Sequence, residues 1–296
     1  MGETSNSTTR DGVWALALHG GAGETATSKN SPWREHMRDL LVKGGENLRR
    51  GASAIEVVHD CVRDLETSGF HLAGKGASPN AAGRWELDAA IMDGETRRAG
   101  AVAALEGVRH PIDVAQLVMT KSRHVLLAGE GACHFAKLHK CKKVKKPGEY
   151  YKPVLSAEPV LEEHGTVGAV ALDRDGLLAS ATSTGGWPGK LHGRVGDTPL
   201  IGAGTWADER VAVSCTGVGE YFIRTSAASD LSARIRYGRQ SVAQAGEGVM
   251  QDIGFLGGAG GLIAIDCLGR ITMPFNTHNM KRGCIHVSGR LEVLEN

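Results

Sequence analysis

The sequence predicts an α+β protein built as a four-layer αββα sandwich, and three observations lead to this fold class. Apolar residues at helical spacing dominate the chain up to about residue 140, whereas the chain from Thr166 onward has the texture of strands. The turn Arg174-Asp175-Gly176 separates two strand candidates, a hairpin signal that favours antiparallel sheets. Helices expected within 221–253 are followed by more strands, so helices must cover the outer faces of the sheets.

The first half of the chain contains the better-defined helices. Val13–Leu18 is a short apolar strand candidate, and the glycine run 19–23 after it predicts a loop. That loop is either a tight turn or a set of backbone N–H groups that could bind an anion. Pro32 after Ser31 is a typical helix start. The expected elements are a helix over 32–50, a helix over 52–66, a strand or buried turn over 85–92, a strand over 99–105, and helices over 111–119 and 129–140.

The second half begins after a segment with the composition of a linker. Residues 141–164 combine a lysine cluster with Pro147, Gly148, Pro153 and Pro159, and we expect this segment to be flexible. The expected elements beyond it are strands over 166–173, 177–182, 201–205 and 211–215, helices over 221–237 and 240–253, a glycine loop over 257–261, and strands over 262–266, 270–274 and from 285.

Composition excludes several classes of protein. A formal net charge of +1 over 296 residues gives no reason to expect nucleic acid or an anionic membrane as a partner. No apolar run approaches the ~18 residues of a membrane span, and residues 1–12 are polar rather than those of a signal peptide. The six cysteines have no regular spacing, and Cys61, Cys215 and Cys267 lie in apolar runs where we expect buried thiols. A cytoplasmic location fits these features best.

The junction Gly165-Thr166, directly before a predicted strand, is the position of most chemical interest. A threonine hydroxyl is a weak nucleophile unless a base removes its proton. A free α-amino group titrates near pH ~8 and can serve as that base, provided that Thr166 becomes an N-terminus. Gly165 tolerates strained backbone angles, so the hydroxyl of Thr166 can approach its carbonyl. We therefore expect the chain to be cut between these two residues.

Residues downstream could complete an active site around Thr166. Thr184 lies at the end of the next expected strand, where its hydroxyl group could line a pocket beside Thr166. Arg194 offers a planar fork for a carboxylate, and Asp197 offers an acceptor for an ammonium, so together they suit an amino-acid head group. The run 215–220, which contains Thr216, Gly217 and Gly219, ends a strand with a hydroxyl and closely spaced N–H donors, as an oxyanion hole requires.

The chain resembles the plant-type L-asparaginase and isoaspartyl peptidase family of N-terminal nucleophile (Ntn) hydrolases over nearly its whole length. Several long motifs carry this resemblance in the same order along the chain. They are HGGAG at 19–23, ELDAAIMDG at 86–94, AGAVA at 99–103, GEGA at 129–132, HGTVGAVALD at 164–173, ATSTGG at 181–186, GRVGDTPLIGAG at 193–204, SCTGVGE at 214–220 and MPFNT at 273–277.

The resemblance implies an αββα fold of the Ntn type and self-cleavage before Thr166. The products would be an α subunit of 1–165 and a β subunit of 166–296, assembled as a dimer of αβ heterodimers. Thr184 would assist the nucleophile, Arg194 and Asp197 would bind the aspartyl head group, and Thr216 and Gly217 would stabilise the oxyanion, with Gly219 beside the substrate. The implied substrates are β-aspartyl dipeptides, placed ahead of L-asparagine, and the implied enzyme needs no organic cofactor.

The family also carries a structural sodium loop, which could hold potassium instead. The matching backbone carbonyls would be those of Leu65, Glu66, Ser68, His71, Ala73 and Lys75. Within that loop the family usually reads Phe-Asn-Ala-Gly where this chain has His71-Leu72-Ala73-Gly74, so an amide near the active site is replaced by Leu72. A second departure is His278-Asn279, where many members carry Glu or Thr followed by Gly, and it could alter the preference for the leaving group.

Two alternative functions stay open at this point. The first is a narrow dipeptidase for one leaving residue, such as the arginine of β-aspartyl-arginine. The second is an uncleaved, non-catalytic binding protein, for which Leu72 is the only support. Glycosylasparaginases share the fold, but the polar residues 1–12 argue against a lysosomal enzyme.

Overall fold

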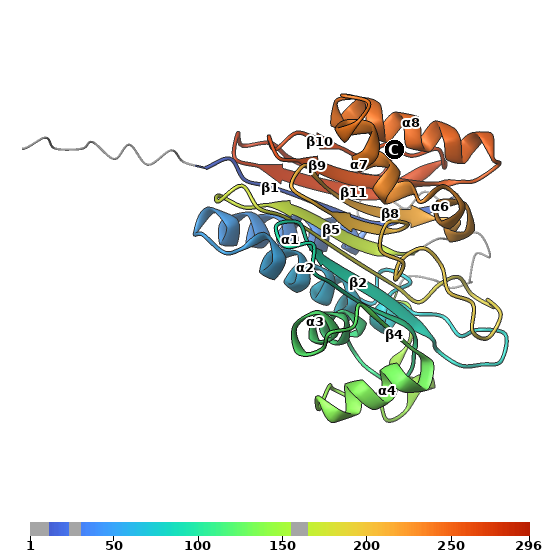
Figure 1. Ribbon diagram of the computed structural model, residues 1–296. Helices are drawn as coiled ribbons and strands as arrows, with labels where there is room; N and C mark the ends of the chain where they lie inside the picture. The colour runs from blue at the N-terminus through green and yellow to red at the C-terminus, as the bar shows by residue number, and fades with distance from the viewer. Residues whose placement is uncertain (1–11, 24–30, 155–164) are drawn as a thin grey trace, which may run out of the picture.

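The protein folds as four layers, with two sheets face to face and helices on both outer faces (Figure 1). The structure is a computed structural model, and it describes residues 12–23, 31–154 and 165–296. The order of layers is helices α1–α4, an eight-stranded sheet, a four-stranded sheet and helices α6–α8. The predicted four-layer αββα architecture is therefore confirmed.

The larger sheet takes strands from both sides of Thr166. Its strand order is β12-β11-β1-β5-β6-β2-β3-β4, and all neighbours are antiparallel except β3 and β4. The strands are β1 (Ala15–Gly23), β2 (Leu87–Asp93), β3 (Ala99–Leu105), β4 (Leu126–Ala128), β5 (Val167–Leu172), β6 (Leu178–Thr184), β11 (Asn279–His286) and β12 (Leu291–Leu294). Strand β5 lies in the middle, between β1 and β6.

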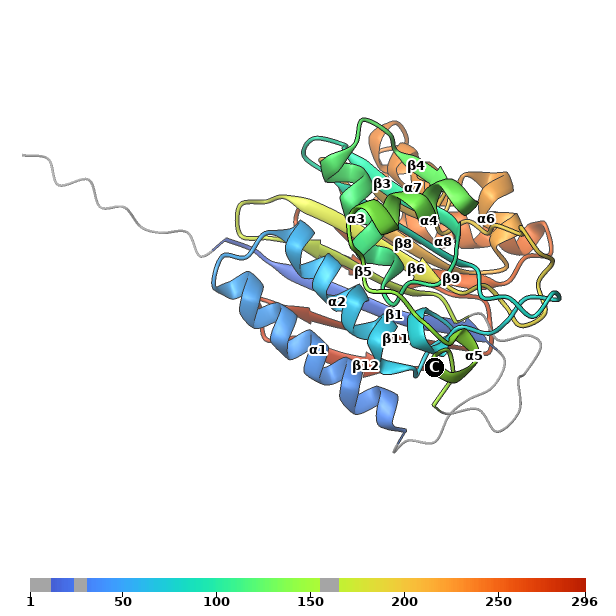
Figure 2. The ribbon, with the colours of Figure 1, turned by 90° about the horizontal axis from the view of Figure 1, so that it is seen from below.

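The smaller sheet has the order β10-β9-β8-β7 and is antiparallel throughout. Its strands are β7 (Thr205–Ala207), β8 (Val211–Gly217), β9 (Gly260–Asp266) and β10 (Ile271–Thr272). Helices α1 (Pro32–Arg49), α2 (Ala54–Ser68), α3 (Pro111–Lys121) and α4 (Gly129–Leu138) lie on the side of the larger sheet (Figure 2). Helices α6 (Gly219–Thr225), α7 (Ala227–Arg236) and α8 (Val242–Phe255) lie over the smaller one.

Three apolar clusters hold these layers together. One packs α1–α3 against the larger sheet around Trp33 and Leu16, and another packs α7 and α8 against the smaller sheet around Phe222. The third lies between the sheets, where Val170 of β5 and Ile263 of β9 are both fully buried. Because strand side chains alternate between faces, neighbouring residues of one strand serve different clusters. The central strands are thus buried on both faces.

The glycine run 19–23 is not a loop, in contrast to its prediction. Strand β1 continues through it to Gly23, with an irregularity in its pairing to β11 between His19 and Ala22. An added Cβ on Gly20 would fall 2.2 Å from the ring of His71, so this strand needs glycine for a close approach. The run therefore serves packing at the end of a strand.

The prediction of a flexible linker over 141–164 is wrong for residues 141–154. Residues 155–164 lie outside the described residues. The short helix α5 (Pro147–Tyr150) follows a bridge between Lys143 and Val108. Tyr151 is only 3% exposed, stacks on Trp85 and donates a hydrogen bond from its hydroxyl to the Val108 carbonyl at 2.7 Å. Proline and lysine suggested flexibility, but these long-range contacts fix the segment.

Other elements were predicted with errors at their boundaries. The helix expected over 221–237 is two helices, because Ser226 adopts a positive φ of 51° between α6 and α7. The strand expected over 201–205 begins only at Thr205, and β11 begins at Asn279 rather than near 285. Cys61 and Cys215 are buried as predicted, whereas Cys267 is exposed at the end of β9. In the described parts of the chain, no helix is both long and apolar enough to span a bilayer.

Candidate active site

Strand pairing places Thr166 beside Thr184. Val167, the first residue of β5, pairs with Ser183 of β6, so the residues just before and after this pair are neighbours across the sheet. The hydroxyl of Thr166 donates to the hydroxyl oxygen of Thr184 over 3.1 Å. The amide of Gly186 donates to the same oxygen at 3.0 Å, so Thr184 keeps its own proton for donation. The predicted pair of hydroxyls is present.

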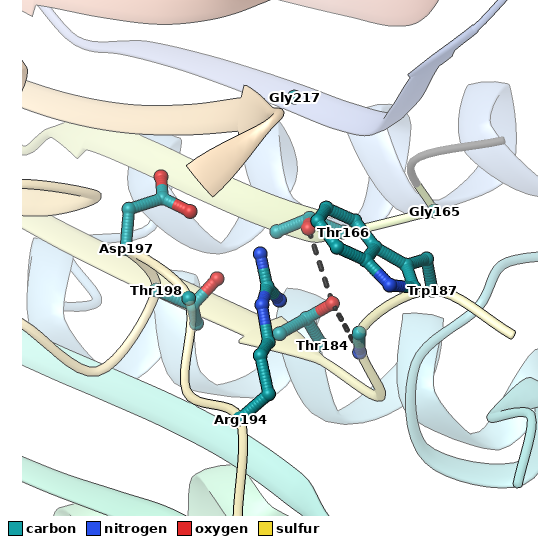
Figure 3. A pocket seen from close by; sticks show the side chains of 10 residues that line it. Gly165, Thr166, Thr184, Trp187, Arg194, Asp197, Thr198 and Gly217 are labelled. Atoms are coloured by element: carbon teal, nitrogen blue, oxygen red, sulfur yellow. Dashed lines mark hydrogen bonds between the residues drawn. The ribbon is translucent and has the colours of Figure 1, made fainter. Parts of the chain in front are cut away.

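A pocket opens in front of these two hydroxyls (Figure 3). It brings together Thr166, Thr184, Arg194, Asp197 and Gly217, five of the predicted site residues, although 51 positions separate the first from the last. Side chains that were not predicted share the lining. The full lining is Gly165, Thr166, Thr184, Gly186, Trp187, Arg194, Gly196, Asp197, Thr198 and Gly217.

Arg194 reaches this pocket with its charge already engaged. Its Nε and Nη2 donate to the two carboxylate oxygens of Glu220, each at 2.9 Å. The guanidinium carbon lies 4.1 Å from the ring centre of Trp187, a distance at which cation–π attraction is appreciable. The arginine is thus held on two sides, and its orientation in the pocket is set before any ligand arrives.

Asp197 is the most unusual charge in the pocket. It is 4% exposed, and its Oδ2 has no hydrogen-bond partner in the described part of the chain. Burial raises the pKa of this carboxyl to about 7, although its own backbone amide and Arg194 favour the charged form. An unpaired buried polar group costs ~1–3 kcal/mol, so Asp197 is suited to a ligand that brings an ammonium group.

The oxyanion residues expected at the end of β8 are only partly brought to the pocket. Gly217 lines it and adopts a φ of +145°, and an added Cβ there would fall 2.4 Å from the Ala259 carbonyl. Thr216 is fully buried and does not line the pocket, and its hydroxyl has no partner within the described residues. Gly219 does not line the pocket but packs closely on Asp197, because an added Cβ on it would fall 2.6 Å from the carboxylate Oδ1.

Three contributors to the site were missed in the sequence. Trp187 and Thr198 line the pocket; Trp187 directly follows the motif at 181–186 and Thr198 lies within the motif at 193–204, which was the signal available. Glu66 was considered only for its backbone carbonyl, yet its buried side chain accepts from the Ser183 hydroxyl at 2.6 Å, next to Thr184. Such long-range contacts have no local signature in a sequence.

The two departures from the family pattern have different surroundings. Leu72 packs at the junction itself, because an added Cβ on Gly165 would fall 2.3 Å from the Cβ of Leu72. His278 is exposed and Asn279 is buried at the start of β11, and neither lines the pocket. The expectation that positions 278 and 279 face the leaving group gains no support from this placement.

The expected sodium loop offers backbone carbonyl oxygens, some of them in crowded surroundings. The carbonyls of Glu66 and His71 face Gly74 and Gly76, on which an added Cβ would fall 2.5 and 2.0 Å from them. The His71 carbonyl accepts from Ala73 N and the Lys75 carbonyl from Lys152 N, and each such oxygen retains a second lone pair. Hard cations prefer oxygen ligands. No three His, Cys, Asp or Glu side chains converge into a metal site among residues 12–23, 31–154 and 165–296.

Comparison with known proteins identifies relatives over nearly the whole chain. A family model described as "Asparaginase" matches residues 12–155 and 149–295. The isoaspartyl peptidase of Salmonella typhimurium is 45% identical over 292 residues, covering 90% of this chain and 93% of the relative. The isoaspartyl peptidase of Escherichia coli is 44% identical, covering 92% of each chain, and a plant-type L-asparaginase of Pyrobaculum calidifontis is 42% identical, covering 90% and 95%.

The buried carboxyl of Asp197 predicts a pH-dependent stability difference between the wild-type protein and Asp197→Asn. The folded-state pKa is about 7 against an ordinary value of 3.8, so the unfolded state releases this proton first as the pH rises. The wild-type fold therefore loses stability between about pH 4 and about pH 7, by up to roughly 4 kcal/mol, and the loss is constant above that range. Asparagine does not ionise and escapes this loss.

Urea unfolding at about pH 5 and about pH 8 measures this difference, with both proteins carrying Thr166→Ala so that they share one covalent state. We expect the free energy of unfolding of the asparagine variant, relative to its control, to rise between the two pH values. An unchanged difference would mean that Asp197 titrates normally in the folded protein.

Proposed function

The chain belongs to the asparaginase family, and we propose on that premise that it is an autoprocessed threonine hydrolase acting on β-aspartyl amides. It converts β-aspartyl dipeptides to L-aspartate and an amino acid, and L-asparagine to L-aspartate and ammonia. One observation carries this proposal: the hydroxyl of Thr166 lies on Thr184 in a pocket that also holds Arg194 and Asp197. A nucleophile and an amino-acid recognition pair therefore share one small space.

The first reaction cuts the chain between residues 165 and 166. Thr166 Oγ1 attacks the Gly165 carbonyl carbon, the C–N bond breaks, and the hydroxyl proton passes to the departing α-amine. Water then hydrolyses the resulting ester, which leaves the carboxylate of Gly165 and the free hydroxyl and amine of Thr166. The absence of a Cβ on Gly165 allows this approach, although Leu72 packs closely against it.

The two resulting pieces, 1–165 and 166–296, would remain together without a covalent link. Strand β5 of the second piece pairs with β1 of the first, and β6 pairs with β2. These pairings bury strands from both pieces in the middle of one sheet. The cut consequently frees an amine at the start of β5 and leaves the core intact.

The second reaction hydrolyses the substrate through the same hydroxyl group. The α-amine of Thr166 takes the hydroxyl proton while Oγ1 attacks the β-carbonyl carbon of the aspartyl group. The backbone N–H group of Gly217 is suited to stabilise the oxyanion. The C–N bond breaks, the leaving amine takes the proton, and water hydrolyses the aspartyl ester to release L-aspartate.

Substrate selection rests on the opposite charges of Arg194 and Asp197. The substrate's α-ammonium would ionise Asp197, because a nearby positive charge favours the carboxylate and offsets the effect of burial on its pKa. The α-carboxylate would bind Arg194, whose guanidinium is already oriented by Glu220 and Trp187. A ligand carrying only one of the two charges leaves one partner unsatisfied.

Several further expectations belong to this proposal. A sodium or potassium ion is held by the backbone carbonyls between Leu65 and Lys75, where it would stiffen the loop that packs on Gly165. The cleaved protein assembles as a dimer of αβ heterodimers. The cytoplasmic location expected from cysteine usage stays a prediction.

A denaturing gel with N-terminal sequencing tests the first reaction. We expect the 31.2 kDa chain to convert into two fragments, the second beginning at Thr166, and Thr166→Ala to stay in one piece without activity. Gly165→Ala should convert more slowly, by about tenfold or more, because its methyl group would clash with Leu72. Gly131→Ala is the matched control, since an added Cβ there meets no atom within 4 Å.

Release of aspartate from asparagine, β-aspartyl-leucine and β-aspartyl-arginine tests the second reaction. Activity on both dipeptides and asparagine is the expected result, and activity on the arginine dipeptide alone would mean the narrow dipeptidase. A wild-type protein that stays uncleaved and inert after long incubation would contradict the whole proposal.

Arg194→Lys should mainly weaken substrate binding. Lysine cannot reproduce the planar fork that holds Glu220 and the ligand together, so we expect KM to rise by about 10- to 100-fold and kcat to change less. Arg224→Lys on the exposed side of α6 serves as the control and should leave both constants near the wild-type values. Unchanged kinetics for Arg194→Lys would remove this residue from the head-group site.

The alkali ion is tested by thermal unfolding without any activity measurement. Tm should be higher in sodium chloride or potassium chloride than in choline chloride of equal ionic strength, because an ion that binds only the folded state stabilises it by mass action. Equal Tm values in all three salts would exclude a structural alkali ion.

A further inference from the structure

A line of buried side chains runs from His19 toward the loop that carries Asp197. His19 is fully buried, and its Nδ1 lies 3.1 Å from the carbonyl oxygen of Thr166. Its other ring nitrogen, Nε2, lies 2.9 Å from the hydroxyl of Ser214. His19 is therefore in direct contact with the main chain of Thr166, and it does not itself line the pocket.

Three hydroxyl groups continue this line, and we name Ser214, Thr182 and Thr205 the hydroxyl chain. Ser214 and Thr182 are 2.7 Å apart, as are Thr182 and Thr205. The hydroxyl oxygen of Thr205 lies 3.1 Å from the carbonyl oxygen of Thr198, the pocket residue next to Asp197, and the adjacent Gly204 amide donates to the Asp197 carbonyl at 3.1 Å. All three side chains are fully buried. The line thus joins the nucleophile at one end to the head-group loop 197–198 at the other.

The fold keeps space for this line between its two sheets. His19 belongs to β1 and Thr182 to β6 of the larger sheet, whereas Ser214 and Thr205 belong to β8 and β7 of the smaller one. An added Cβ on Gly168 would fall 2.0 Å from the Ser214 hydroxyl and 2.3 Å from His19 Nε2. Only glycine at 168 leaves room for the contact between the two side chains.

The direction of each hydrogen bond in the line follows from the groups at its beginning, the Thr166 carbonyl and the His19 ring. A carbonyl oxygen only accepts, so His19 carries its proton on Nδ1 and donates to Thr166. Burial lowers the pKa of His19 to about 3, so the ring is neutral and Nε2 accepts from Ser214. Ser214 must then accept from Thr182, and Thr182 from Thr205, which uses the single proton of Thr205. The link to the head-group loop is made by the amide next to Thr205, because Gly204 N donates to the Asp197 carbonyl at 3.1 Å. A neutral His19 therefore orients every proton in the hydroxyl chain.

We propose that His19 is a positioning residue, and that the hydroxyl chain behind it ties the main chain of Thr166 to the head-group loop 197–198. This inference rests on the proposed function. The acyl carbon must lie about 3 Å from Thr166 Oγ1 while the same substrate is held at Asp197, so the distance between these two points decides the reaction rate. A chain of buried, mutually polarised hydrogen bonds is stiff, and it spans this distance from behind the pocket.

Ser214→Ala breaks the line without touching the pocket, and Ser180→Ala is its matched control. Both serines are fully buried; the Ser180 hydroxyl donates to the Val213 carbonyl at 2.7 Å and has no link to His19. Per cleaved enzyme, we expect Ser214→Ala to lower kcat by about tenfold with KM within about threefold of wild type. Ser180→Ala should keep the wild-type kcat even though it loses a comparable buried hydrogen bond and a similar amount of Tm.

Two replacements of His19 separate its two contacts. His19→Asn places an N–H near the position of Nδ1 and can still donate to Thr166, whereas His19→Gln reaches toward Ser214 instead. We expect the asparagine variant to retain more of kcat than the glutamine variant. Equal kcat values in Ser214→Ala, in both His19 variants and in the wild-type enzyme would overturn the proposal.

Neutron diffraction from deuterated crystals of the wild-type protein tests the same inference when a variant fails to fold. The expected map has deuterium on His19 Nδ1, none on Nε2, and the Ser214 deuteron directed at Nε2. Deuterium on Nε2 would overturn the assignment. A protein that passes this test but neither cleaves itself nor hydrolyses β-aspartyl substrates would refute the proposed function alone, whereas an active enzyme with a fully active Ser214→Ala variant would refute only the positioning role.

Discussion

The pairing of β5 with its two neighbours is the constraint on which the candidate active site depends. The register that sets Val167 against Ser183 also sets Thr166 beside Thr184, and pairing with β1 brings His19 against Gly168. Because side chains alternate along a strand, a slip of one residue would turn the hydroxyl of Thr166 away from its partner. Burial of β5 on both faces makes such a slip costly, so the hydrophobic core and the chemistry are specified together.

Burial also explains the electrostatics of the pocket. Asp197 stands in a place where its charge is poorly solvated, and Arg194 is held by Glu220 and Trp187 rather than by Asp197. In the proposed function, the α-ammonium group of the substrate would pair with Asp197 and its α-carboxylate with Arg194. His19 is also buried, but burial keeps its ring neutral, so it contributes hydrogen bonds instead of charge. In the proposed function, the charges of Arg194 and Asp197 would bind the ligand, whereas the neutral His19 would position Thr166.

Much of the fold could be predicted, because it follows from local patterns. The helices α1 and α2 and the hairpin of β5 and β6 were predicted, with errors of a few residues at their ends. The failures occurred where distant contacts overrule local composition. Tyr151 anchors a segment with the composition of a linker, and the glycine run after Leu18 continues a strand because neighbouring β-strands pair with it.

For the site, the residues alone indicated a nucleophile at Thr166 and a head-group pair at Arg194 and Asp197, because the chemistry of a side chain is a local property. Only the tertiary structure decided which of these groups meet. It brought Gly217 to the pocket and left Thr216 outside it, and it added Trp187 and Thr198. It also decided that burial raises the pKa of Asp197 to about 7 and that His19 contacts the carbonyl oxygen of Thr166. Proximity and burial arise from strands that are far apart in the chain, and no short stretch of sequence encodes them.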